Sequence, residues 1–151
     1  MRSSKSTVLF LCTGNYYRSR YAEEFFNHHA AARSLGVRAQ SKGLARDLSA
    51  LGNVGPISPY ALERLQRRGV TAIGRHRFPV AVEAADFETH TRVIVLSRAE
   101  HEPMVAALFP RHVRSTIIEY WDIEDDHLES PETALTRLER RLIDLLDEWA
   151  D

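Results

Sequence analysis

The feature that most constrains the fold is an apolar strand that runs into a short polar loop and then into a helix. Val8–Leu11 is a continuous apolar run, as expected for a central parallel strand covered on both faces. Cys12 opens the loop that follows, and Arg18 closes it where the next helix begins. This arrangement predicts an α/β fold in which the loop lies at the carboxyl end of the first strand.

The loop has the residues of an anion site. Gly14 and Asn15 are the residue types that most readily adopt positive φ, so successive backbone N–H groups can turn inward around an anion. The following helix directs the positive end of its dipole at the same point. This setting favours the thiolate form of Cys12, and Arg18 adds a planar pair of donors that matches phosphoryl oxygens. The loop therefore predicts a nucleophile at the bottom of a phosphate site.

The stretch C-x5-R-S from Cys12 to Ser19, with G-N inside it, resembles the phosphate loop of the low-molecular-weight protein tyrosine phosphatases. The related arsenate reductases share that scaffold. A lone cysteine at a strand end is otherwise most often a small buried hydrophobe, but here the strand, the helix and the loop residues agree with the motif. The resemblance implies catalytic roles for Cys12 and Arg18. It implies that the substrate is bound by Thr13, Gly14, Asn15, Tyr16, Tyr17 and Ser19. Many relatives carry a second cysteine where this chain has Tyr17.

Strand and helix signals alternate along the rest of the chain. Further strands are expected at 37–41, 92–96 and 116–119, and helices at 19–35, 59–68, 99–109 and from Ser130 onward. Such alternation implies an α/β three-layer sandwich with a central parallel sheet. The resemblance covers nearly the whole chain and implies a single domain over residues 1–151, with about four strands flanked by helices and the phosphate loop after strand 1.

Composition and charge exclude several function classes. The formal net charge is −1, so no attraction to nucleic acid or to an anionic membrane is expected. No apolar run approaches the length of a transmembrane helix, and Val8–Leu11 is too short for a signal-peptide core. The single cysteine excludes an internal disulfide and fits a reducing compartment, which predicts a cytoplasmic location. The basic cluster Arg64, Arg67 and Arg68 is expected to form a solvated helix face.

A second informative stretch is the acidic segment 121–126, WDIEDD. The phosphatase family carries its general acid in an Asp-Pro loop a few residues beyond a tryptophan. The resemblance therefore gives the role of general acid to Asp125. Asp126 stands where proline is usual, and Glu124 and Asp122 are competing carboxylates. A plain acidic surface turn is the alternative interpretation.

Supporting residues are less well defined. Ser41 matches a family serine that supports the phosphate loop by hydrogen bonding, although a strand-end hydroxyl in a turn is equally expected. The family often has a histidine that supports this serine. His76 is nearby, but Gly74 or Arg75 aligns with that position, so the role is not assigned. The loop segment 47–54, where relatives commonly place an aromatic residue against the substrate ring, contains none.

The resemblance implies a phosphomonoester hydrolase, most directly a protein tyrosine phosphatase, that acts through a cysteinyl-phosphate and uses no metal or cofactor. Its expected partners are a phosphorylated protein or small phosphomonoester and the oxyanions phosphate or arsenate. Arsenate reduction is a first alternative. The thioredoxin-coupled version needs further cysteines, whereas a version with an external small thiol needs only Cys12. A second alternative is an oxyanion-binding regulatory module with weak catalysis, suggested by Asp126 and by the missing aromatic residue.

Overall fold

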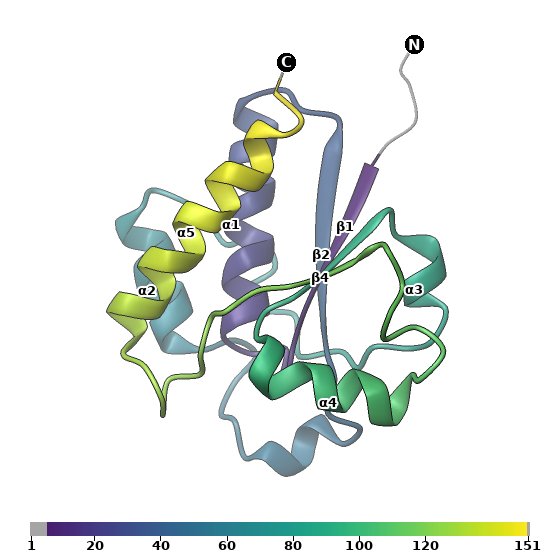
Figure 1. Cartoon of the computed structure of the whole chain (residues 1–151). Coiled ribbons are helices and arrows are strands. Elements are labelled where there is room, and N and C mark those ends of the chain that lie inside the picture. Colours follow the sequence, from purple (N-terminus) through teal and green to yellow (C-terminus); the bar gives the residue numbers. More distant parts are fainter. Residues whose placement is uncertain (1–5, 151) are drawn as a thin grey trace.

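The computed structural model describes residues 6–150, and within them four parallel strands form one sheet. The strands are β1 (Ser6–Cys12), β2 (Val37–Gly43), β3 (Arg92–Val95) and β4 (Ile118–Tyr120), in the spatial order β2-β1-β3-β4 (Figure 1). The register aligns Cys12 with Gly43 on one side of β1 and Leu11 with Val95 on the other. The predicted parallel sheet is confirmed, with strand ends that differ from the expected ones by one or two residues.

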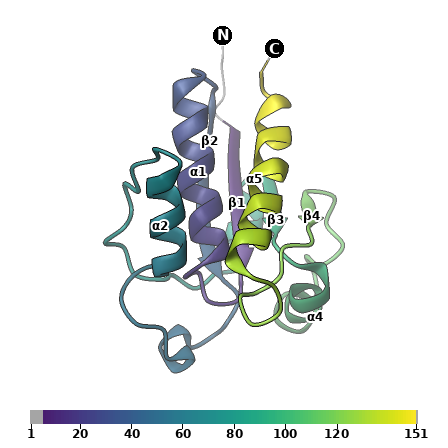
Figure 2. The same cartoon turned by 90° about the vertical axis from the view of Figure 1, so that its left-hand side faces the viewer.

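Helices cover both faces of this sheet, which confirms the predicted three-layer sandwich (Figures 1 and 2). One face is covered by α1 (Arg18–Ala32), α2 (Pro59–Arg67) and α5 (Pro131–Asp147), and the other by α3 (Asp86–Thr89) and α4 (Arg98–Leu108). The single turns α3 and η1 (Leu48–Leu51) were not predicted, because four residues are too few to show a helical period. No helix within residues 6–150 is long and apolar enough to cross a membrane.

The alternation of side chains along β1 places Cys12. Val8 and Phe10 lie on the face that packs against α1, α2 and α5, whereas Leu9 and Leu11 face the core beneath α3 and α4. Cys12 has the same parity as Phe10 and belongs to the first of these two cores. Its side chain therefore leaves the strand on the side where α1 begins.

The basic cluster on α2 is not a solvated face, so that prediction was wrong for Arg64. Its guanidinium is buried, and Nε donates to Glu139 Oε2 on α5 at 2.9 Å. Arg68 Nε donates to the same oxygen at 3.1 Å, and the Tyr21 hydroxyl donates to it from α1. Arg67 remains about half exposed. Glu139 is distant in sequence from α2, so a pattern within that helix could not reveal the pairing.

Glu139→Gln should lower the free energy of unfolding near neutral pH by about 3 kcal/mol. Burial opposes ionisation of this carboxyl, but hydrogen bonds from Arg64, Arg68 and Tyr21 lower the pKa of Glu139 to about 2 from about 4.5. A carboxyl with a depressed folded-state pKa stabilises fully above its unfolded pKa. The wild-type advantage should therefore be complete above about pH 5 and disappear as pH falls toward 2.

Urea unfolding of both proteins between pH 2 and 7 measures this effect. Asp144→Asn is the matched control, because Asp144 is an exposed carboxylate of α5 with no ion pair among residues 6–150. The control should follow the wild-type pH profile. A Glu139→Gln protein whose stability deficit is the same at pH 3 and pH 7 would contradict the assigned charge pairing.

Candidate active site

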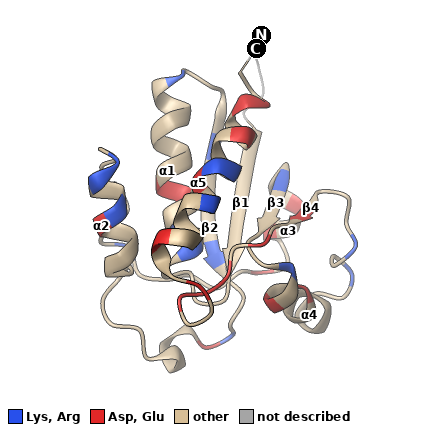
Figure 3. Cartoon of the chain, turned by 60° about the vertical axis from the view of Figure 1, so that its left-hand side comes forward, with Lys and Arg blue, Asp and Glu red and all other residues tan. Residues whose placement is uncertain are grey.

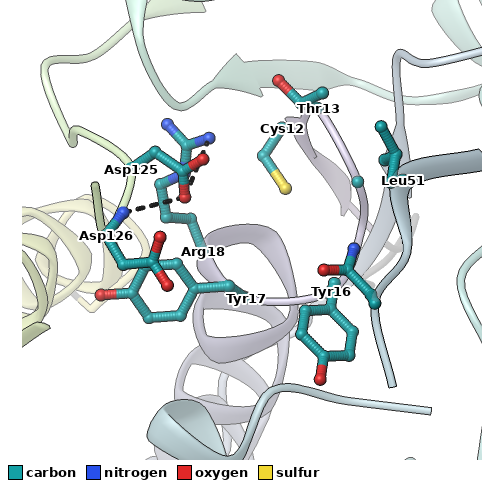
Figure 4. A pocket seen from close by; sticks show the side chains of 10 residues that line it. Cys12, Thr13, Tyr16, Tyr17, Arg18, Leu51, Asp125 and Asp126 are labelled. Carbon is teal, nitrogen blue, oxygen red and sulfur yellow. Dashed lines mark hydrogen bonds and ion pairs between the residues drawn. The ribbon is translucent and has the colours of Figure 1, made fainter. Parts of the chain in front are cut away.

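A pocket of about 210 Å³ opens at the carboxyl end of β1 (Figure 4). Its walls come from the loop between β1 and α1, from the segment that follows β2, and from the acidic segment that follows β4. The lining residues are Cys12, Thr13, Gly14, Tyr16, Tyr17, Arg18, Leu51, Asn53, Asp125 and Asp126. The fold thus brings together two stretches that lie more than a hundred residues apart in sequence.

The loop turns at Asn15, not at Gly14. Asn15 has a positive φ of 49°, whereas Gly14 is not among the residues with positive φ. Gly14 is instead closely packed, because a Cβ there would lie 3.1 Å from Leu51 Cδ1 and 3.3 Å from Asn53 Nδ2, so these two side chains would have to shift by a few tenths of an ångström. The expectation that both residues supply positive φ is therefore corrected for Gly14.

The backbone carbonyl groups of this loop are used within the fold, whereas its N–H groups have no acceptor among the described residues. The carbonyl groups of Cys12, Thr13 and Tyr16 accept hydrogen bonds from backbone N–H groups of residues outside the pocket lining. Within residues 6–150, the backbone N–H groups of residues 13–17 have no hydrogen-bond acceptor. A run of such N–H groups beside a helix N-terminus is an anion-binding arrangement.

The nucleophile candidate is held by a directional hydrogen-bond chain. Cys12 Sγ lies 3.1 Å from Ser19 Oγ, and Asn15 Nδ2 donates to that same oxygen at 2.9 Å. Asn15 Oδ1 accepts from the backbone N–H of Val80 at 3.0 Å, which fixes the orientation of the amide. Because the Ser19 oxygen accepts from Asn15 at 2.9 Å, its own hydrogen is free to donate to the sulfur of Cys12 when that sulfur is ionised.

The same amide joins Ser41 to the loop. Asn15 Nδ2 donates to Ser41 Oγ at 2.9 Å, and Ser41 donates to Glu23 Oε1 at 2.5 Å. Arg77 completes the arrangement, with Nη1 donating to Asn15 Oδ1 at 3.2 Å and Nη2 to Ser41 Oγ at 3.1 Å. Ser41 therefore lies where a loop-supporting serine is expected. Arg77, rather than His76, contacts it.

Arg18 is buried, and its hydrogen bonds decide which edge of the guanidinium faces the pocket. Nη1 and Nη2 donate to the two carboxylate oxygens of Glu100 at 3.0 Å each, and Nη1 also donates to the carbonyl of Ile123 at 3.0 Å. Nε has no partner within residues 6–150. The N–H groups left over, on Nε and Nη2, share one edge, and such an edge can bind two phosphoryl oxygens.

Glu100 lies in the first turn of α4 and is itself well held. The Thr13 hydroxyl donates to Glu100 Oε2, and the buried His101 has its Nε2 3.0 Å from that hydroxyl. His101 Nδ1 accepts from the Ser97 N–H at 3.1 Å, so the ring proton is on Nε2. Burial opposes ionisation of Glu100, but hydrogen bonds from His101 and Arg18 keep the pKa of this carboxyl well below its ordinary value.

The acidic segment between β4 and α5, seen in red in Figure 3, contributes Asp125 and Asp126 to the pocket lining (Figure 4). Asp125 Oδ1 lies 3.8 Å from Arg18 Nη2 and accepts from the backbone N–H of Asp126 at 2.9 Å. Asp126 also lines the pocket, whereas Asp122 pairs with Arg141 at 3.0 Å. Among these carboxylates, Asp125 is the one that contacts Arg18.

Aromatic side chains reach the pocket from the loop itself. Tyr16 donates its hydroxyl to the Val54 carbonyl at 2.6 Å, which holds its ring against the segment after β2. Tyr17 is buried, and burial followed by the charge of Asp126 raises the pKa of its hydroxyl. In Figure 4 the two rings lie on opposite sides of the opening. Leu51 lines the pocket from the segment 47–54, which has no aromatic residue.

Comparison with known proteins agrees with this geometry. The sequence profile of one family, the low-molecular-weight phosphotyrosine protein phosphatases, matches residues 7–149. The chain belongs to this family. It is therefore an enzyme of the cysteine-based kind that includes the phosphatases and the arsenate reductases. No curated protein matches the chain significantly by sequence.

Solved structures of this family and its relatives share the fold. YfkJ from Bacillus subtilis has a TM-score of 0.81 and 22% identity, with 98% of this chain and 96% of that chain covered. Wzb from Vibrio vulnificus, in complex with benzylphosphonate, has a TM-score of 0.72 and 18% identity over 97% and 98%. A thioredoxin-dependent arsenate reductase from Corynebacterium glutamicum has a TM-score of 0.69 and 22% identity over 98% and 63%.

Two residues at this phosphatase-family site were not found from the sequence. Arg77 contacts Asn15 and Ser41, but it lies one residue beyond the nearest histidine and does not match the expected residue type. Glu100 contacts Arg18 from a helix about eighty residues away, and an acidic residue in the first turn of a helix is common for electrostatic reasons alone. Neither residue had a local signal that distinguished it.

Proposed function

We propose that this phosphatase-family chain hydrolyses phosphomonoesters through a cysteinyl-phosphate, with phosphotyrosine in proteins as its substrate class. The observation that carries the proposal is the contact between Cys12 Sγ and Ser19 Oγ at the bottom of a pocket that also presents the free edge of Arg18. The ionised sulfur that the mechanism needs would accept a hydrogen bond from Ser19, and an oxyanion above it meets the loop N–H groups and the guanidinium.

In the first step, the Cys12 thiolate attacks phosphorus in line with the bond to the leaving oxygen. The S–P bond forms as the P–O bond breaks. Arg18 and the N–H groups of residues 13–18 stabilise the charge on the three equatorial oxygens. Asp125 supplies the proton that the leaving oxygen needs, and the product alcohol or phenol departs.

In the second step, water displaces the sulfur from the cysteinyl-phosphate. Asp125, now ionised, accepts a proton from the attacking water. Inorganic phosphate leaves, and the thiolate of Cys12 is restored with the Ser19 hydroxyl beside it. In both steps Arg18 supplies positive charge, and the neutral loop amides donate hydrogen bonds to the phosphoryl oxygens.

The preference for an aromatic ester is supported by the pocket lining. Tyr16 and Tyr17 flank the opening, and Leu51 adds an apolar side chain between the loops. Aromatic rings and apolar side chains favour a phenyl ring that follows the phosphoryl group into the pocket. Benzylphosphonate, which is bound to the structural relative Wzb, also joins an aromatic ring to a phosphoryl-like group.

The test is hydrolysis of p-nitrophenyl phosphate, followed by a phosphotyrosine peptide and its phosphoserine counterpart. We expect turnover of the first two and much slower release of phosphate from the third. A protein that binds inorganic phosphate but hydrolyses neither aryl ester would contradict the proposal and favour an oxyanion-binding module.

Arsenate reduction is the second candidate, favoured by the likeness to the Corynebacterium arsenate reductase. That relative depends on thioredoxin, whereas this chain has Cys12 as its one cysteine and would need an external small thiol to release arsenite. Arsenate-dependent oxidation of glutathione or mycothiol, measured beside phosphate release, separates the two activities. We expect arsenate to inhibit hydrolysis and to cause no thiol oxidation.

Peroxide should inactivate the protein without forming an intramolecular disulfide. Cys12 is the chain's one cysteine, and Tyr17 occupies the position where many relatives have a resolving cysteine. A sulfenic acid at Cys12 must therefore await an external thiol or proceed to sulfinic acid. The fraction of activity that dithiothreitol restores should decrease as the time in peroxide increases. Bound phosphate should slow the oxidation of Cys12, because it covers the sulfur. Mass spectrometry decides the matter, because an unmodified Cys12 in inactivated protein would refute this account.

A further inference from the structure

Arg18 has two acidic neighbours that contact it unequally. Glu100 accepts from both terminal nitrogens of the guanidinium at 3.0 Å, whereas Asp125 approaches one of them at 3.8 Å. Glu100 is also fixed by Thr13 and by the start of α4, so it cannot move with the pocket wall. Asp125 is about one-third exposed on a loop. Glu100 is thus a bidentate hydrogen-bonding partner of Arg18, whereas Asp125 makes a longer ion pair with it.

We infer that Glu100 is the standing counter-ion of Arg18 and thereby leaves Asp125 free to carry the proton that the leaving group needs. This inference rests on the proposed function of the site. A carboxyl that must act as an acid has to keep its proton beside a buried guanidinium, which favours its ionised form. Glu100 opposes that effect in two ways, by neutralising the guanidinium and by repelling a second negative charge. It is a positioning residue, since it acts through Arg18 and Asp125.

The other charged and titratable groups near Asp125 come from every element that meets the pocket. They are Arg18 and Tyr17 on or before α1, Cys12 at the end of β1, Glu100 and His101 on α4, and Glu124, Asp126, His127 and Glu129 on its own loop. His101 is buried and neutral, because burial lowers the pKa of its ring. His127 Nδ1 lies 3.5 Å from Asp125 Oδ2 but is largely exposed to solvent. Glu100 is therefore the fixed negative charge on the far side of the guanidinium.

Removal of the Glu100 charge should strengthen the ion pair between Asp125 and Arg18. In Glu100→Gln the guanidinium loses its bidentate carboxylate, and the nearest remaining carboxylate is Asp125. Asp125 should then lose its proton about one pH unit lower or more, the shift that an unshared arginine produces in a neighbouring aspartate. The alkaline limb of the pH–kcat profile should move by the same amount, and kcat at neutral pH should fall roughly 10-fold as a consequence.

The deciding measurement is a carbon-13 NMR titration of the Asp125 side-chain carboxyl, with its signal assigned by its loss in Asp125→Asn. It needs no turnover, so it reports on Glu100 even if wild-type protein hydrolyses nothing and the proposed function fails. Glu102→Gln is the matched control, because it removes the same charge from α4 at a residue that pairs with Arg98 instead. The control should titrate like wild type.

A shift of the Asp125 midpoint to lower pH in Glu100→Gln, absent in Glu102→Gln, is the expected result. Identical midpoints in wild type and Glu100→Gln would overturn the inference, even if the variant were slower, since a slower enzyme alone would fit a structural role. If Glu100→Gln fails to fold, Glu100→Asp keeps the charge but is too short to reach both nitrogens. Because this variant keeps the negative charge beside Arg18, its Asp125 midpoint should stay near that of wild type, and a downward shift of about one pH unit or more would overturn the role of the charge.

Discussion

Cys12→Ser should reduce hydrolysis of p-nitrophenyl phosphate by roughly 10⁴-fold or more while inorganic phosphate still binds. The substitution removes the thiolate, and a serine hydroxyl at this position has no general base beside it: Ser19 Oγ is already occupied by the Asn15 amide. The oxyanion contacts do not depend on sulfur, because they come from the loop N–H groups and from Arg18. Isothermal titration with phosphate and a kinetic assay on the same preparation measure the two properties.

Arg18→Lys is the companion variant that separates binding from chemistry. Lysine is a point charge and cannot present two parallel donors, so phosphate affinity should fall together with the rate. Cys12→Ser should leave phosphate affinity within a few-fold of wild type. Retained turnover in pure Cys12→Ser protein would contradict the covalent mechanism. Loss of phosphate binding in this variant would show that the sulfur, and not the loop N–H groups and Arg18, holds the anion.

The part of the site that could be predicted from sequence is the part that is local. The apolar strand residues, the turn residues and the start of the helix all lie between Val8 and Ser19. The order of these three signals predicts the loop and its position at the end of the strand. Two strands were predictable for the same reason, since β1 and β3 are short apolar runs, whereas β2 alternates buried and exposed residues and β4 is short and half-buried. The position of Asp125 came from the family resemblance, and the geometry is consistent with it.

Residues that act across the fold were not predictable. Three charged residues have partners that are distant in sequence: Glu100 pairs with Arg18, Arg77 with Glu23 and Glu139 with Arg64. In each case the sequence around the residue does not indicate its partner. Gly14 was predicted for a different reason than the structure shows. The sequence suggested a positive φ, whereas the structure shows a close approach of neighbouring side chains. The steric limit imposed by Leu51 and Asn53 depends on a loop whose path the sequence does not state.

Asp125→Asn should lower kcat by roughly 10²–10⁴, the usual loss when a positioned proton donor is removed. An asparagine oxygen can still accept the hydrogen bond that the Asp126 N–H makes at 2.9 Å, so the loop should keep its shape. The loss should grow with the basicity of the leaving group. Within that range it should be smallest for p-nitrophenyl phosphate, larger for phenyl phosphate and largest for an alkyl phosphate, because poor leaving groups depend most on protonation. The alkaline limb of the pH–kcat profile should disappear with the carboxyl.

Asp126→Asn is the sharpest control for this assignment, since it makes the same chemical change one residue away in the same pocket wall. Within residues 6–150 its carboxylate makes no ion pair with Arg18, whereas Asp125 Oδ1 lies 3.8 Å from Arg18 Nη2. Glu124→Gln and Asp122→Asn extend the comparison to the other acidic residues of the segment, and all three should retain the leaving-group dependence of wild type. If one of them shows the steep dependence and Asp125→Asn does not, the general acid is that residue. The 3.8 Å approach of Asp125 would then reflect charge attraction to Arg18 alone.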